Sequence, residues 1–140
     1  MKYYAVIDTN VIVSSFLQSG SIPNQVVKQA LDGSIIPLIS DEILFEYNDV
    51  LTRNKFQIEK EKLDDFFALL VTRAIRLDRT ITDEEFSDSD DIVFYEVALT
   101  GKKTKETYLI TGNKKHFPVK SFVVTPREMM DIIERDQNSK

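Results

Sequence analysis

The sequence predicts an α/β fold, a three-layer α/β/α sandwich in which helices cover both faces of a central, mostly parallel sheet. Short apolar runs rich in strand-forming residues alternate along the chain with longer segments whose apolar residues recur at helical spacing. Strands that are separated by helices are joined by crossovers, which give parallel pairing. Ligands of such sheets bind outside the carboxyl ends of the strands, where the strand order reverses. The residues that follow each strand are therefore the first place to look for chemistry.

The predicted strands are short and rich in apolar residues. The first, Tyr3–Ile7, has the sequence YYAVI and ends directly at Asp8. The later strands are expected at residues 35–39, 75–77, 107–110 and 122–124.

The predicted helices have apolar residues at three- and four-residue spacing and recognisable ends. Gly33 is placed to end one helix, Ser40 to cap the next, and Thr125 to cap the last with Pro126 at its first position. The helices are expected at residues 23–32, 41–53, 59–74 and 91–99 and from residue 126 onward.

Length and composition are those of one globular domain. We expect the domain to span residues 1–136 and residues 137–140 to form a disordered tail. The absence of cysteine excludes a disulfide scaffold and a thiolate metal site, and agrees with a cytoplasmic location. No run resembles a signal peptide or a membrane span, so no membrane contact is expected.

The net charge of −5 argues against a protein that holds nucleic acid by charge alone. A metal-dependent nuclease is less constrained, because it needs clustered carboxylates for its metal. Positive charge for such a substrate would have to come from local patches, although a lysine run is as often a solvated loop. The candidates are Arg53, Lys55, Lys102, Lys103, Lys105, Lys114 and Lys115.

Acidic and amide side chains stand at strand ends and helix starts. Asp8 follows the first strand and either caps the next helical turn or faces the crevice as a cation ligand. Glu46 flanks the apolar arc of its helix and faces either solvent or a cleft. Asp88, Asp90 and Asp91 precede an apolar helix, where acids complement the helix dipole, but they also repel one another and a cation would relieve that repulsion.

The neighbouring strand end carries Thr111, Gly112 and Asn113. Oxygen ligands, with no cysteine and a single histidine, suit Mg²⁺ or Mn²⁺ and not zinc. The one histidine, His116, could touch a phosphate, although a structural role before Phe117 is the simpler interpretation.

In their order and spacing these segments resemble the PIN-domain family, in particular its toxin components of bacterial toxin–antitoxin systems. The resemblance covers nearly the whole chain. It rests on VIDTNV at 6–11, SDEILFE at 40–46, DSDD at 88–91 with Phe94, Ala98 and Leu99, LITGNKKHFP at 109–118 and FVVTP at 122–126.

The resemblance implies a metal-dependent endoribonuclease that hydrolyses single-stranded RNA, is restrained by an antitoxin protein and forms a homodimer. Asp8, Glu46 and Asp91 would be the catalytic, metal-binding acids, with Asp90 a nearby candidate. Asn113 occupies the fourth acidic position, where most members have Asp, so metal affinity should be lower. The supporting hydrogen-bonding groups would be Thr9, Asn10 and Thr111.

Two other functions fit parts of the sequence. A PIN-like module that binds RNA or protein without cutting would explain Asn113 and the acidic net charge. A phosphoryl-accepting domain like a response regulator would use a strand-end Asp, but it needs a second acid beside the first and a lysine where Thr111 to Asn113 stand. We therefore rank it below the other two.

Overall fold

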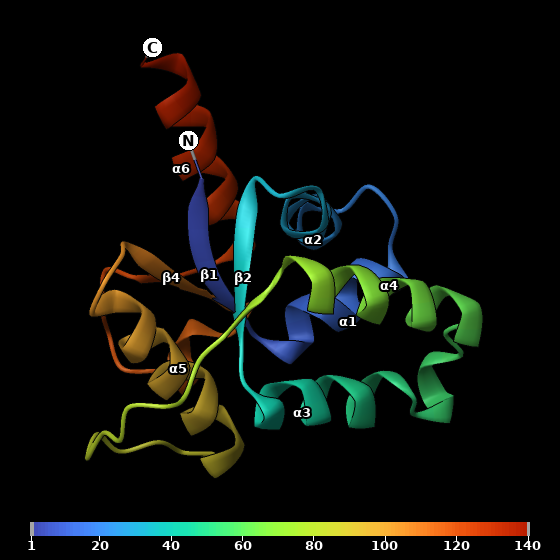
Figure 1. The fold of residues 1–140 in the computed structure, drawn as a ribbon, viewed down its shortest axis with the longest axis horizontal. Helices are drawn as coiled ribbons and strands as arrows, with labels where there is room; N and C mark the ends of the chain where they lie inside the picture. Colours follow the sequence, from blue (N-terminus) through green and yellow to red (C-terminus); the bar gives the residue numbers. More distant parts are fainter. Residues whose placement is uncertain (1, 140) are drawn as a thin grey trace.

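The computed structural model describes residues 2–139 and contains one parallel sheet with the strand order β3-β2-β1-β4-β5. The sheet and its helices form the three-layer α/β sandwich that the sequence predicted (Figure 1). The strands are β1 (Tyr3–Ile7), β2 (Ile35–Ile39), β3 (Ile75–Arg76), β4 (Thr107–Ile110) and β5 (Val123–Val124). The α-helices are α1 (Thr9–Leu17), α2 (Ile22–Asp32), α3 (Asp41–Leu51), α4 (Lys60–Arg73), α5 (Ile92–Lys102) and α6 (Pro126–Asn138).

The layers follow from the crossovers. The chain moves from β1 to β2 and β3 on one side, then returns past β1 to β4 and β5 on the other. Helix α5 packs against β1, β2 and β4, whereas α2 packs on β2 beside α1, α4 and α6. The strand order therefore reverses between β1 and β4, which is where a parallel sheet opens a crevice.

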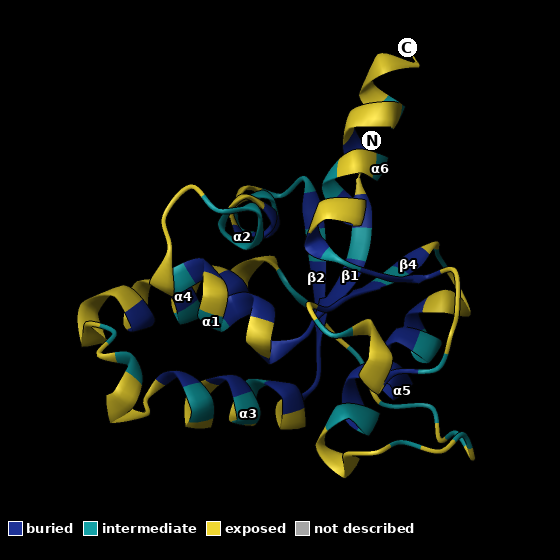
Figure 2. Cartoon of the chain, turned by 180° about the vertical axis from the view of Figure 1, so that it is seen from behind, coloured by how far each residue is buried: buried dark blue, intermediate teal, exposed yellow. Residues whose placement is uncertain are grey.

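The predicted elements are confirmed, with differences at their ends. The strands are near-continuous apolar runs because helices cover both faces of the sheet. The buried residues gather along the central strands and the helix faces turned toward them (Figure 2). Helix α6 continues to Asn138, into the segment expected to be a tail, and Lys140 lies outside the described residues.

Helix α1 was not predicted from the sequence. Its residues, TNVIVSSFL, are mostly apolar and often β-branched, so they resemble a continuation of β1 more than an amphipathic helix. The strand ends at Ile7, and Asp8, with extended backbone angles, is the N-cap residue at which α1 begins. Among the described residues, no helix is long and apolar enough to cross a membrane.

Helix α3 is fixed to the end of β1. Ser40 caps it by accepting a hydrogen bond from the Ile43 amide at 3.2 Å, as the sequence predicted. The buried Tyr47 hydroxyl donates to the carbonyl of Ile7, the last residue of β1. This bond joins the helix that carries Glu46 to the strand that ends at Asp8.

We expect Tyr47→Phe to lower the free energy of unfolding by about 1 kcal/mol, because a buried carbonyl loses its hydroxyl donor. Urea denaturation would measure the change. Tyr108→Phe is the matched control, since its hydroxyl bonds Glu106 at an exposed position. Equal losses in the two variants would show that the Tyr47 bond does not join α3 to β1 in solution.

Candidate metal and nucleic-acid site

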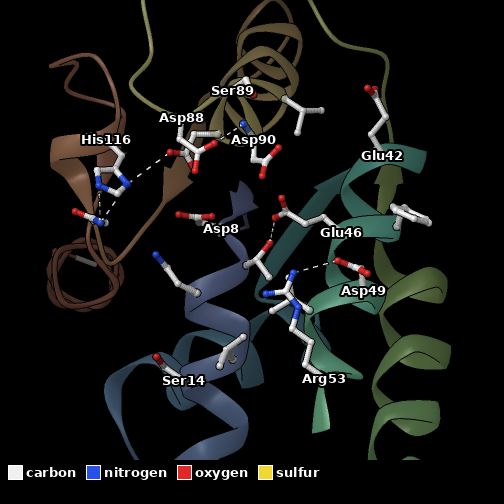
Figure 3. A pocket seen from close by; sticks show the side chains of 18 of the residues that line it. Asp8, Ser14, Glu42, Glu46, Asp49, Arg53, Asp88, Ser89, Asp90 and His116 are labelled. Atoms are coloured by element: carbon white, nitrogen blue, oxygen red, sulfur yellow. Dashed lines mark hydrogen bonds and ion pairs between the residues drawn. The ribbon is translucent and has the colours of Figure 1, made fainter. Parts of the chain in front are cut away.

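A cleft of about 760 Å³ opens at the carboxyl ends of β1 and β4, where the strand order reverses. Four segments that are distant in sequence line it: the start of α1, one face of α3, residues 88–91 and residues 113–116. Figure 3 shows the carboxylates of Asp8, Glu46 and Asp90 directed into the same space. The structure thus brings together the candidate residues Asp8, Thr9, Asn10, Glu46, Asp90, Asp91, Asn113 and His116.

Asp8 does not cap the helix that follows it. Its backbone occupies the N-cap position of α1, but its side chain makes no capping hydrogen bond. Asp8 is only 6% exposed, and its carboxylate instead accepts a hydrogen bond from Thr111 at 2.7 Å. The same Thr111 hydroxyl accepts from the Asn113 amide at 3.0 Å. The ends of β1 and β4 are therefore tied together at Asp8.

Glu46 faces the cleft and not open solvent. Its carboxylate accepts a hydrogen bond from the Thr9 hydroxyl of α1 (Figure 3). Asn10, the next residue of α1, accepts from the Gly112 amide at 3.3 Å. Thr9 and Asn10 thus hold α1 against α3 on one side and against the β4 loop on the other.

The acids of residues 88–91 divide into two roles. Asp88 accepts a hydrogen bond from the Asp90 amide at 2.9 Å and so caps the short 3-10 turn Ser89–Asp91. Asp91 makes no capping bond at the start of α5. Its buried Oδ2 has no hydrogen-bond partner among the described residues, and the Nδ1 of His116 lies 3.6 Å away. Asp91, together with the more exposed Asp90 beside it, is therefore available to a ligand in the cleft.

The three carboxylates are costly to ionise together. Burial raises the pKa of Asp8, and the hydrogen bond from Thr111 partly offsets the rise. Burial also raises the pKa of Glu46, and the charge of Asp8 adds to it. Burial, followed by the charges of Asp8 and Asp88, raises the pKa of Asp91 to about 6. A cation in the cleft would relieve both the desolvation and the repulsion.

Asn113 and His116 lie at the β4 side of the cleft. The Asn113 side-chain nitrogen is 3.1–3.2 Å from the two His116 ring nitrogens. The imidazole is about half exposed and stands between Asn113 and Asp91. His116 therefore lines the cleft as well as preceding the buried Phe117, so both interpretations of it from the sequence remain compatible with its position.

The positive charges that line the cleft are Arg53 and Arg79. Arg79 was not predicted from the sequence, because it lies in a loop without periodicity after β3. Its guanidinium bonds Glu42 and the buried Glu96, each at 2.6 Å. The candidate lysines are engaged elsewhere or do not line the cleft: Lys55, Lys102 and Lys105 lie over aromatic rings, and Lys114 pairs with Glu128.

The donor set fits a hard divalent cation. Carboxylate and amide oxygens converge on the cleft, and one buried carboxylate oxygen lacks a partner among the described residues. Across residues 2–139, no three or more His, Cys, Asp or Glu side chains already stand close enough together to hold a metal ion.

Residues 4–115 match the family model described as the PIN domain. The chain belongs to the PIN-domain family. The match contains Asp8, Glu46, Asp91 and the Thr111–Asn113 turn, and it leaves β5 and α6 outside. A comparison with curated proteins gives no match. PIN domains are generally metal-dependent nucleases, so the family indicates a nuclease-type fold for this chain.

Asp91→Asn should stabilise the metal-free protein near neutral pH by roughly 2 kcal/mol, a value reduced for solvent screening of a partly exposed group. The folded state holds the Asp91 proton with a pKa of about 6, against an ordinary value of 3.8. Folding stability is therefore lost as the pH rises from about 4 to about 6, where the folded state binds more protons than the unfolded state. The variant removes this loss, and its advantage should vanish below about pH 4.

Thermal unfolding in EDTA across this pH range measures the effect. Asp90→Asn is the matched control, because the Asp90 side chain is exposed and one residue away. If Asp91→Asn were no more stable than wild type at neutral pH, the ionised Asp91 carboxylate would not destabilise the folded protein, contrary to the prediction.

Proposed function

We propose that this PIN-domain protein is a Mg²⁺- or Mn²⁺-dependent endoribonuclease that hydrolyses phosphodiester bonds in single-stranded RNA. The observation that carries the proposal is the convergence of Asp8, Glu46 and Asp91 at the switch point of the sheet, with Asp91 Oδ2 buried and without a hydrogen-bond partner among the described residues. These acids come from three separate elements, so their meeting is a product of the fold and not of one acidic run.

The roles of the residues follow from their positions. Asp8, Glu46 and Asp91 would supply carboxylate ligands and Asn113 an amide oxygen, with Asp90 at the rim. A bound Mg²⁺ or Mn²⁺ supplies charge neutralisation at the phosphate and a more acidic water. Glu46, whose pKa burial raises, is suited to orient the attacking water and accept its proton.

The supporting hydrogen bonds hold these groups in place. Thr111 orients Asp8, Thr9 orients Glu46, and Asn10 fixes the turn at Gly112. Groups that orient metal ligands typically change metal affinity or activity by about 10- to 100-fold when removed. These three residues are therefore proposed as positioning residues and not as ligands.

The biological setting is the second part of the proposal. The resemblance to toxin components supports a cytoplasmic toxin that is held inactive by an antitoxin protein and forms a homodimer. The complete set of candidate ligands within one chain supports a toxin whose catalytic site needs no residue from its antitoxin. Copurification with the protein encoded beside it would test the pairing.

Purified wild-type protein, freed of any partner, should cut single-stranded RNA in Mn²⁺ and stop when EDTA is added. Asp8→Asn should reduce the rate by roughly 10³-fold, because it loses several kcal/mol of metal-dependent stabilisation. Gel analysis of a labelled RNA measures both results.

The matched control is Asp65→Asn, which changes an exposed acid of α4 outside the cleft and should cut at the wild-type rate. Cleavage by Asp8→Asn at the wild-type rate, in preparations of equal purity, would rule out the proposed mechanism.

A PIN-like module that binds RNA or a protein without cutting is the second candidate. Asn113 favours it, because an amide gives one charge less than the usual Asp and so binds a divalent cation more weakly. This candidate predicts RNA binding that barely responds to EDTA and no cutting by folded wild-type protein. Membership of the PIN-domain family removes the support for the phosphoryl-accepting domain.

A further inference from the structure

Phe45 is an exposed aromatic residue at the edge of the acidic cleft. It lies directly before Glu46 on α3, lines the cleft and is 73% exposed. Among the large apolar side chains of residues 2–139 that are exposed, it is the one aromatic. An aromatic ring that the core does not use, beside a phosphodiester site, indicates a ligand with a flat apolar face.

One face of α3 forms a continuous strip along the cleft. Its members recur at three- and four-residue spacing and therefore lie on the same side of the helix. Figure 3 shows Glu46, Asp49 and Arg53 following one another along this side. The strip consists of Glu42, Phe45, Glu46, Asp49, Val50 and, just after the helix, Arg53. About two helical turns, or roughly 10 Å, separate Glu46 from Arg53.

The charge of the cleft cannot by itself attract RNA. Seven carboxylates line the cleft against two arginines, and both arginines are paired with acids. A negative cleft repels phosphates, so affinity for a nucleic acid must come in part from an uncharged interaction. Stacking of bases on an aromatic ring is such an interaction, and it tolerates any base.

The two arginines differ in how firmly they are held. Arg79 is fixed by Glu96, which is 2% exposed, at 2.6 Å. Arg53 pairs with Asp49 at 3.2 Å, and both side chains are about half exposed. An exposed ion pair of this kind contributes little to stability, so Arg53 can exchange Asp49 for a phosphate at low cost.

We propose that Phe45 and Arg53 form a subsite for single-stranded RNA. A base next to the scissile phosphodiester stacks on Phe45, and a phosphate further along the strand binds Arg53. This inference rests on the proposed nuclease function and adds a reason why the enzyme would prefer single-stranded RNA to a duplex. The bases of a duplex are already stacked and are not free to lie on Phe45, whereas those of a single strand are.

Phe45→Trp gives a direct probe, because the sequence contains no tryptophan and the introduced indole is then the single one. In an Asp8→Asn background, which prevents cutting, a short single-stranded RNA should quench its fluorescence. The same RNA annealed to its complement should not. Ile81→Trp in the same background is the matched control, since Ile81 is 78% exposed and does not line the cleft.

Activity gives a second readout. Phe45→Ala should lower kcat/KM for single-stranded RNA by about tenfold, mainly through KM, the value of roughly one stacked base. Phe45→Trp should keep kcat/KM near the wild-type value. Phe45→Leu, which keeps the apolar surface without a ring face, should lose it as Phe45→Ala does. Circular dichroism would confirm that each variant is folded.

The outcomes separate the two proposals. Quenching of the Phe45→Trp protein by single-stranded RNA, with no cutting by the wild type, supports the subsite and contradicts the nuclease. Cutting by the wild type, with no quenching and an unchanged Phe45→Ala, overturns the subsite and leaves the nuclease standing. Quenching of the Ile81→Trp protein as strong as that of the Phe45→Trp protein, or equal quenching by the duplex, also overturns the subsite.

Discussion

The carboxylate of Asp8 is held almost out of solvent where β1 ends, and it is stabilised there by the Thr111 hydroxyl from the neighbouring strand. A buried carboxylate is tolerated only where hydrogen bonds or a cation offset its lost hydration. This requirement couples the fold to the site, since Thr111 is in place only when β1 and β4 pair in parallel. Tyr47 and Thr9 then bring α3 and Glu46 to the same edge.

Much of the architecture follows from local patterns. Buried parallel strands must be apolar on both faces, so β1, β2 and β4 are evident as short apolar runs bounded by turn residues. The caps Ser40 and Thr125 mark helix starts because they offer side-chain acceptors to free amides. Helix α1 escaped prediction because its sequence is mostly apolar and β-branched, and only Asn10 and Ser14 mark its exposed polar face.

The residue types of the candidate site can be predicted from the sequence, but the separate role of each acid cannot. Sequence spacing places Asp88, Asp90 and Asp91 together, yet only the folded chain shows that Asp88 caps a turn while Asp91 Oδ2 lies buried and unbonded among the described residues. The position of Arg79 in the cleft and the exposure of the Phe45 ring are set by how distant segments pack together. No local periodicity encodes such contacts.

The acidic charge of the cleft affects the proposed binding of both the metal and the substrate. The acids that suit a divalent cation also repel a polyanion, so in the proposed nuclease the cation would serve both the chemistry and the approach of RNA. Asn113, in place of a further acid, would lower this repulsion and also the metal affinity of the proposed site. A net charge of −5 is thus compatible with a nuclease whose affinity for RNA comes from metal, stacking and one exchangeable arginine.

The proposed divalent-cation site is built by Asp8, Glu46 and Asp91. Anomalous diffraction from crystals soaked in Mn²⁺ locates the ion directly. A single strong peak within roughly 2–2.5 Å of carboxylate oxygens of Asp8 and Asp91 is the predicted result. A peak held only by Asp88 and Asp90, or no peak in the cleft at saturating Mn²⁺, would contradict it.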